Sequence, residues 1–159
     1  HEDAAPDFSH YPAGSLPRPE LGGVQFDLIA GAALGEESPV RVFSPLCYLA
    51  AELAPGHSFC WPRQYAEQAV YVVEGEIEVS TTKIPEHRMG LLPDADEVTI
   101  GSEPGARIAI LAGEPIGHRH LWWNFVSSDP DRIRAAAQLW ADGGFERVPG
   151  DDEFIPLPD

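Results

Sequence analysis

The stretch that decides the fold is residues 54–79, APGHSFCWPRQYAEQAVYVVEGEIEV. Side chains alternate in character over residues 70–73 and again over residues 76–80, and this period of two is typical of half-buried β-strands. Glu74-Gly75 separates the two runs. Glycine reaches positive φ without a Cβ clash, so we expect a tight hairpin turn at this dipeptide.

Short strands are predicted on both sides of this stretch. We expect them at residues 24–29, 40–43, 46–53, 97–100, 106–111 and 121–126, which with the central segment makes about nine. Residues 31–39 are expected to form a loop and residues 80–90 a polar connection. Sixteen prolines and fifteen glycines punctuate the chain, as the turns of a barrel or sandwich require. The pattern predicts an all-β domain.

One helix is predicted near the end of the chain. Ser128 or Asp129 can cap its amino end, and Pro130 is tolerated in the first turn. Its apolar stripe, spaced at i, i+3, i+4 and i+7, consists of Ile133, Ala136, Ala137 and Trp140. Gly143-Gly144 is expected to end it.

The bulk composition bounds the classes of partner. The 159 residues suit one domain, and 10 Lys and Arg against 26 Asp and Glu give a net charge of −16. Such a surface repels phosphates, so we expect neither direct nucleic-acid binding nor membrane association. Cys47 and Cys60 have no CxxC spacing, which favours two thiols in a reducing compartment and a cytoplasmic protein.

The central stretch also resembles the first signature of the cupin barrels. In that signature two His and one acid lie between two glycines and bind iron, manganese or copper. Gly56 and Gly75 match the glycines. The ligand positions fall on Pro62, Gln64, Gln68 and, from the second cupin signature, Val98. Proline and valine offer no donor atom and neutral amides are poor ligands, so we expect a vestigial site without metal. Gln64 and Gln68 are the polar groups predicted to face a barrel cavity.

His118 and His120 form an HxH pair that allows a second interpretation. Two His on one face of a strand make half of a metal site. Against this, Arg119 lies between them, Gly117 indicates a loop, and no carboxylate partner is identifiable. Both interpretations stay open at this point.

Four segments resemble the pirin family, in its C-terminal half. They are GEPIGHRHLWWNFVSS (113–128), DFSHYP (7–12), SPL (44–46) and PGDDEFIPLP (149–158). The resemblance implies a cupin-type, jelly-roll barrel with one C-terminal helix and extended arms at both ends. Pirins have two cupin barrels, and their iron-type metal is held by three His and one Glu of the N-terminal barrel. That barrel has no counterpart in these residues, so the resemblance implies no cofactor here.

The resemblance also implies a division of the chain and a set of functions. We expect an arm at 1–23, a barrel at 24–126, a helix at 127–144 and an acidic tail at 145–159. The leading hypothesis is a metal-free scaffold that packs against a metal-bearing cupin or self-associates, through candidates Phe8, Tyr11, Trp140 and Phe154. The alternatives are quercetin 2,3-dioxygenation in an intact parent, metal-independent binding of a small molecule, and regulation of transcription through protein contacts.

Overall fold

A computed structural model describes residues 4–5, 7–147, 149–150 and 153–158. They form two compact units, one spanning Ala5–Pro115 and the other built mainly on the residues from Ile116 onward. We call the first the barrel unit and the second the hairpin–helix unit. Among the described residues, no helix has the length and apolarity needed to cross a bilayer.

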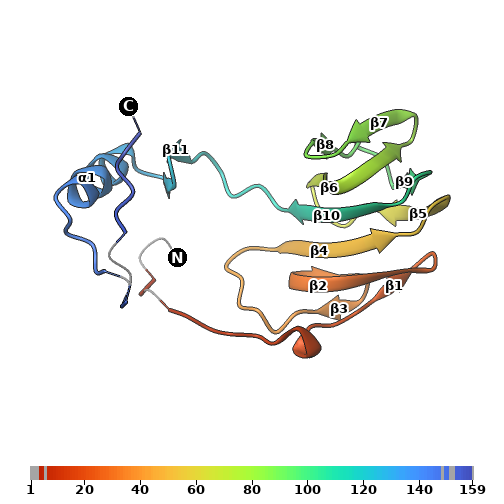
Figure 1. The fold of residues 1–159 in the computed structure, drawn as a ribbon, viewed down its shortest axis with the longest axis horizontal. Helices are drawn as coiled ribbons and strands as arrows, with labels where there is room; N and C mark the ends of the chain where they lie inside the picture. Colours follow the sequence, from red (N-terminus) through yellow and green to blue (C-terminus); the bar gives the residue numbers. More distant parts are fainter. Residues whose placement is uncertain (1–3, 6, 148, 151–152, 159) are drawn as a thin grey trace. The chain divides into compact units, whose positions relative to one another are not determined.

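The barrel unit is a nearly closed antiparallel barrel (Figure 1). Its strands are β1 (Glu20–Leu21), β2 (Val24–Ala33), β3 (Glu36–Glu37), β4 (Leu46–Leu53), β5 (His57–Pro62), β6 (Glu67–Val79), β7 (Thr82–Pro85), β8 (Met89–Leu91), β9 (Glu97–Ser102) and β10 (Ala106–Gly113). They follow the order β1-β2-β4-β10-β6-β9-β5, with β3 on β2 and with β7 and β8 on β6. The ends of this order approach each other, since His57 Nε2 lies 2.9 Å from the carbonyl oxygen of Gly22.

The predicted hairpin at Glu74-Gly75 is wrong, because β6 runs through this dipeptide without reversing. Opposite it, the register with β10 shifts between Arg107 and Ile108, which leaves Val73 as the extra residue of a β-bulge. Gly75 has a φ of 84°, and a Cβ there would lie 2.3 Å from the carbonyl oxygen of Gly105. The glycine therefore bends a long strand that pairs with β10 and β8 before the bend and with β7 and β9 after it.

Other strand predictions need smaller corrections. The first strand continues past residue 29 to Ala33, so part of the expected loop at 31–39 is strand. Residues 40–43 are not a strand. The expected connection at 80–90 contains β7 and the start of β8, and the tight turn lies at Ser80-Thr81, where Ser80 has a φ of 57°. The remaining strands at 46–53, 97–100 and 106–111 are confirmed.

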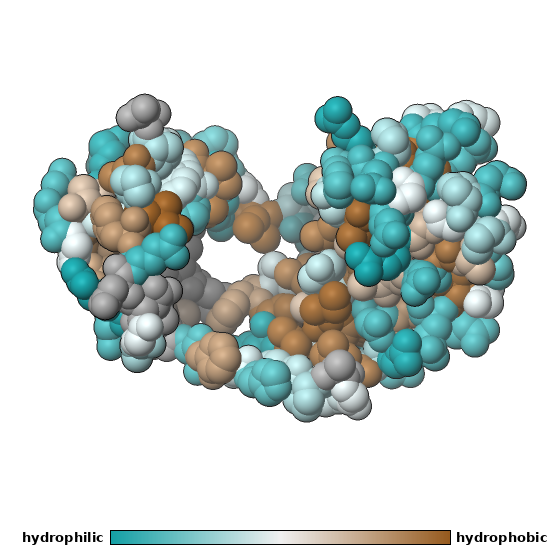
Figure 2. Space-filling view, viewed as in Figure 1, coloured by the Kyte–Doolittle hydropathy of each residue, from teal (hydrophilic) through white to brown (hydrophobic). Residues whose placement is uncertain are grey.

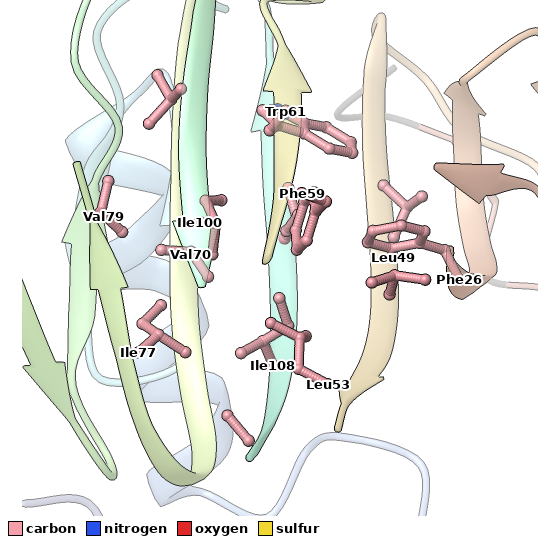
Figure 3. Close-up of a cluster of buried hydrophobic side chains, with 14 of the residues drawn as sticks. Phe26, Leu49, Leu53, Phe59, Trp61, Val70, Ile77, Val79, Ile100 and Ile108 are labelled. Atoms are coloured by element: carbon pink, nitrogen blue, oxygen red, sulfur yellow. The ribbon is translucent and has the colours of Figure 1, made fainter. Parts of the chain in front are cut away.

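The core of the barrel fills the space between the strands (Figure 3). Phe26, Phe59 and Trp61 form its aromatic centre, with the Phe26 ring 5.3 Å from Phe59 and 6.0 Å from Trp61. Leu49 on β4 and Ile108 on β10 are fully buried beside them. Burial of this many apolar side chains is the main favourable contribution to folding.

The arm before Val24 lies along β2 over its last residues. The backbone N–H of Phe26 donates to the carbonyl of Pro19, and that of Leu28 donates to the carbonyl of Pro17. Proline has no N–H to donate, so this segment fits only at the edge of the sheet.

The hairpin–helix unit contains β11 (His120–Trp122), β12 (Phe125–Ser127) and α1 (Pro130–Ala141). The strand expected at 121–126 is instead this two-stranded hairpin, and its turn includes Trp123 at a φ of 52°. The helix prediction is confirmed, with Asp129 as the cap, since its Oδ1 accepts from the N–H of Asp131 at 2.8 Å. Hydrogen bonds from Gly143 and Gly144 to the last helical carbonyls end α1.

Aromatic side chains make the small core of this unit. Trp123 packs edge-on against Trp140 at 5.2 Å, and Phe125 stacks on Phe145 at 6.2 Å. The tail returns to the same cluster, because Phe154 stacks on Trp140 and the indole N–H of Trp140 donates to the carbonyl of Ile155.

Candidate functional site

The four predicted ligand positions lie toward one end of the barrel, and Gln68 is at the position where the cupin signature has an acid. Its Oε1 accepts from the indole N–H of Trp61 at 3.0 Å and from the backbone N–H of Gln64 at 3.4 Å. Both donors are protein groups. The oxygen that would replace a carboxylate ligand is therefore already used to fix the indole in the core.

Gln64 occupies a second ligand position, in the loop between β5 and β6. Its Oε1 accepts from the backbone N–H of Leu34 at 3.0 Å, which fixes the orientation of the amide because Leu34 can only donate there. The Nε2 atom is buried without a hydrogen-bond partner among the described residues. An unpaired buried donor costs about 1–3 kcal/mol, so this amide is held at some cost to stability.

The remaining two positions offer no ligand. Val98 is 3% exposed and belongs to the apolar core, and Pro62 ends β5. The amide oxygen of Gln68 accepts a hydrogen bond from Trp61, and that of Gln64 accepts one from Leu34. These side chains therefore do not form a ligand set that suits iron, manganese or copper. No metal-dependent step can be assigned to these residues.

Cys47 and Tyr65 are two further polar groups at this end of the barrel. Burial raises the pKa of the Cys47 thiol to about 11. A hydrogen bond with the backbone of Ala112 acts in the opposite direction but has the smaller effect on this pKa. The Tyr65 hydroxyl lies 2.7 Å from the carbonyl of Ala32 and 3.0 Å from that of Leu46. Burial is also the main cause that raises the pKa of Tyr65. Tyr65 thus ties its loop to β2 and to β4.

Two shallow hollows open near these residues. Gln64 and Tyr65 line one of about 400 Å³ beside the turn between β2 and β3, together with Glu36 and Glu37. Gln68 lines the other, which is apolar and measures about 550 Å³. The two glutamines predicted to share one cavity therefore border different hollows.

His118 and His120 are brought together by the start of β11. Their ring centroids lie 4.6 Å apart in an edge-to-face arrangement, and His120 is half-buried. In the part of the chain that the structure describes, no group of three His, Cys, Asp or Glu residues could hold a metal ion. The pair supplies two nitrogens, and a metal role for it remains a prediction.

The four interface candidates differ in exposure. Phe8 is 88% exposed and Phe154 is 56% exposed. Tyr11 and Trp140 are half-buried. Trp140 is the structural centre of the aromatic cluster, which leaves Phe8 and Phe154 as the freer surfaces for a contact.

A larger apolar surface, which we call the outer face, was not predicted. In register across β4, β10, β6 and β8 lie Tyr48, Leu111, Ala69 and Leu91. Cross-strand partners share one side of a sheet. Leu91 is 83% exposed and its neighbour Met89 is 58% exposed. Figure 2 shows hydrophobic surface over the ends of β4 and β10, where the apolar hollow lies.

The signal for the outer face is present in the sequence of β10. In residues 106–113, ARIAILAG, the side chains on both faces of the strand are apolar except for Arg107. In a strand with one face toward solvent, apolar and polar side chains would alternate. Such a run predicts a strand covered on both sides.

The comparison with known sequences decides the family. A sequence profile described as the Pirin C-terminal cupin domain matches residues 48–146. The chain belongs to the pirin family. The resemblance expected from the sequence is thereby confirmed.

Individual pirin relatives match nearly the whole chain. A pirin-like protein of Caulobacter vibrioides is 39% identical over 161 residues, covering 99% of this chain and 56% of its own length. Human pirin is 29% identical over 154 residues, covering 90% of this chain and 53% of its own. This pirin-family chain therefore spans about half the length of these curated relatives.

A solved structure shows the same fold. A quercetin 2,3-dioxygenase of Acinetobacter baumannii is similar with a TM-score of 0.82 at 27% identity, over 96% of this chain and 52% of that chain. The prediction of a cupin-type barrel with one C-terminal helix is confirmed.

Proposed function

We propose that this pirin-family chain acts as a metal-free cupin that packs its outer face against a second, metal-bearing cupin barrel. The observation that carries the proposal is the row across four strands that consists of Tyr48, Leu111, Ala69 and Leu91. Tyr48 and Leu111 are 37% and 38% exposed. A contiguous apolar patch of this kind marks an interaction surface.

Two further observations support a cupin as the partner. The matched relatives are nearly twice as long as this chain, which leaves room in them for another domain. The amides at the vestigial positions bond to Trp61 and Leu34, which suits a barrel kept as a scaffold. The metal would then belong to the partner barrel.

A binding experiment tests the outer face. The purified chain is titrated by calorimetry with the separately expressed half of the Caulobacter relative that this chain does not match. We expect binding that weakens at least tenfold in Leu91→Asp and in Leu111→Asp. Leu139→Asp is the matched control, because Leu139 is 47% exposed on α1 and lies outside the outer face. Equal affinity of all variants would contradict the proposal.

A second candidate function concerns a longer protein of which this domain would form half. The similarity to a solved quercetin 2,3-dioxygenase favours flavonol dioxygenation there, at the other barrel. A quercetin turnover assay on the full-length Caulobacter relative tests this candidate. Elemental analysis and the same assay on the purified chain test the metal-free proposal. Stoichiometric iron and turnover in this chain alone would overturn the metal-free proposal.

The surroundings of the protein are part of the same proposal. Cys47 and Cys60 are both free thiols, which favours the reducing cytoplasm. The net charge of −16 favours protein partners over nucleic acid, so any effect on transcription would pass through protein contacts.

A further inference from the structure

A groove of about 500 Å³ lies within the hairpin–helix unit, between β11 and α1. Ile133 and Ala137 form its side on α1, and Trp122 borders it from β11. Leu157 of the tail reaches into the same groove. Its size lies within the range of small-molecule sites in proteins.

The apolar surface around the groove is incompletely covered. Leu121 on β11 is 72% exposed and Trp122 is 38% exposed. Ile133 is the one residue of α1 that is buried. The groove therefore offers an apolar molecule contacts that the unit itself does not supply.

The charges at the groove differ from those of the rest of the chain. Its lining contains Arg134 and His120 but neither Asp nor Glu. Over residues 116–147 the four basic side chains Arg119, Arg132, Arg134 and Arg147 match the four acids Asp129, Asp131, Asp142 and Glu146. The whole chain has 10 Lys and Arg against 26 acids, so this segment is less acidic than the chain as a whole.

Arg134 is placed to bind an anion at the edge of the groove. Its guanidinium pairs with Asp131 on the preceding turn of α1, and the Arg134 side chain is 70% exposed. Five N–H donors leave some available for a second carboxylate beside the one already bound.

From this combination we infer that the groove binds an apolar organic acid, with the chain or ring against Ile133, Ala137 and Trp122 and the acidic head at Arg134. The large apolar contact supplies affinity and the guanidinium sets the orientation. A neutral apolar molecule would use only the first of these contacts.

Fluorescent probes test the inference on the intact chain. The anionic probe is 8-anilinonaphthalene-1-sulfonate, and N-phenyl-1-naphthylamine is its uncharged counterpart. We expect Arg134→Gln to weaken the anionic probe about three- to tenfold while the neutral probe is unchanged. Ala137→Trp fills the groove and should weaken both probes at least tenfold. Ala135→Trp is its control, since Ala135 is exposed on α1 and does not line the groove.

Additional variants and competitors control for effects outside the groove. Ala141→Trp blocks the other end of the groove, and circular dichroism checks that each variant keeps its helix. Leu91→Asp should leave binding unchanged, because Leu91 lies on the outer face. Decanoate or cinnamate should displace the anionic probe, and the better competitor shows whether an acyl chain or a ring fits. Unchanged binding in Ala137→Trp, loss of it in Leu91→Asp, or displacement by neither acid would overturn the inference.

Discussion

Gln68 couples the wall of the barrel to its aromatic centre through the indole of Trp61. In Gln68→Leu the indole N–H stays buried without an acceptor, which should cost about 1–3 kcal/mol of unfolding free energy. Urea unfolding measures it. A double-mutant cycle with Trp61→Phe, which removes the donor, should show a favourable coupling of about 0.5–1.5 kcal/mol. Additive effects of the two substitutions would mean that the hydrogen bond does not contribute.

Cys47 gives the barrel a dependence on alkaline pH. A thiol in the unfolded chain titrates near 9.0, whereas burial raises the pKa of Cys47 to about 11 in the folded chain. Between these values the folded state keeps a proton that the unfolded state releases, so stability falls as pH rises. We expect a loss of at most about 2 kcal/mol from pH 9 to pH 11.

Comparison of two variants isolates this effect from other groups that titrate in the same range. Urea unfolding at pH 9 and at pH 11 should show a smaller loss in Cys47→Ala than in the natural chain. Cys60→Ala is the matched control, because the Cys60 thiol is exposed and should leave the loss unchanged. If both variants lose the same unfolding free energy between pH 9 and pH 11, the pH dependence comes from residues other than Cys47.

At the four predicted ligand positions, the sequence gives the residue chemistry but not the contacts that the side chains make. That Pro62, Gln64, Gln68 and Val98 form a poor donor set follows from the residue types alone. The hydrogen bond between Gln68 and Trp61 depends on the conformation of the loop between β5 and β6, and the one between Gln64 and Leu34 depends on a turn 30 residues away. The outer face depends in the same way on the register of four strands.

At the scale of elements, the bulge at Gly75 sets the course of β6. Gly75→Ala should destabilise the barrel through both the strained φ and the clash with the carbonyl of Gly105. Gly35 is a matched control, since its φ of 82° is similar but nothing lies within 4 Å of an added Cβ. We expect Gly75→Ala to cost roughly 1–3 kcal/mol more than Gly35→Ala, measured by thermal unfolding. If the two substitutions destabilise the barrel equally, the backbone of β6 can shift to accommodate a Cβ at residue 75.

Local signals explain which elements could be predicted. The helix at Pro130–Ala141 has its cap, its stripe and its terminating glycines all within 16 residues, so its bounds follow from the sequence. A glycine between two alternating runs suits a hairpin turn and a bulge equally well. Whether Gly75 forms a turn or a bulge depends on the pairing with β10, which lies more than 30 residues later, and this pairing produces the bulge. Likewise, the chain reverses direction at Trp123 without a glycine or proline that would predict a turn there.

At the scale of the whole molecule, charge and the outer face act against each other. Two copies with a net charge of −16 repel, while Leu91 and Leu111 favour contact. Salt screens the repulsion, so sedimentation should show more dimer at about 0.5 M NaCl than at about 0.02 M. The double variant Leu91→Asp, Leu111→Asp should stay monomeric at both concentrations. Association that decreases with salt would indicate ionic contacts instead.

The place of β10 in the sheet has a consequence for synthesis of the chain. This strand comes last in the barrel unit, yet it lies in the middle of the sheet, between β4 and β6 (Figure 1). When a nascent chain has left the ribosome only as far as Gly105, β4 and β6 are both outside but the strand that pairs with both, β10, has not yet emerged. Closure must therefore wait for residues 106–113, and until then the edges of β4 and β6 are unpaired and exposed to association with other chains.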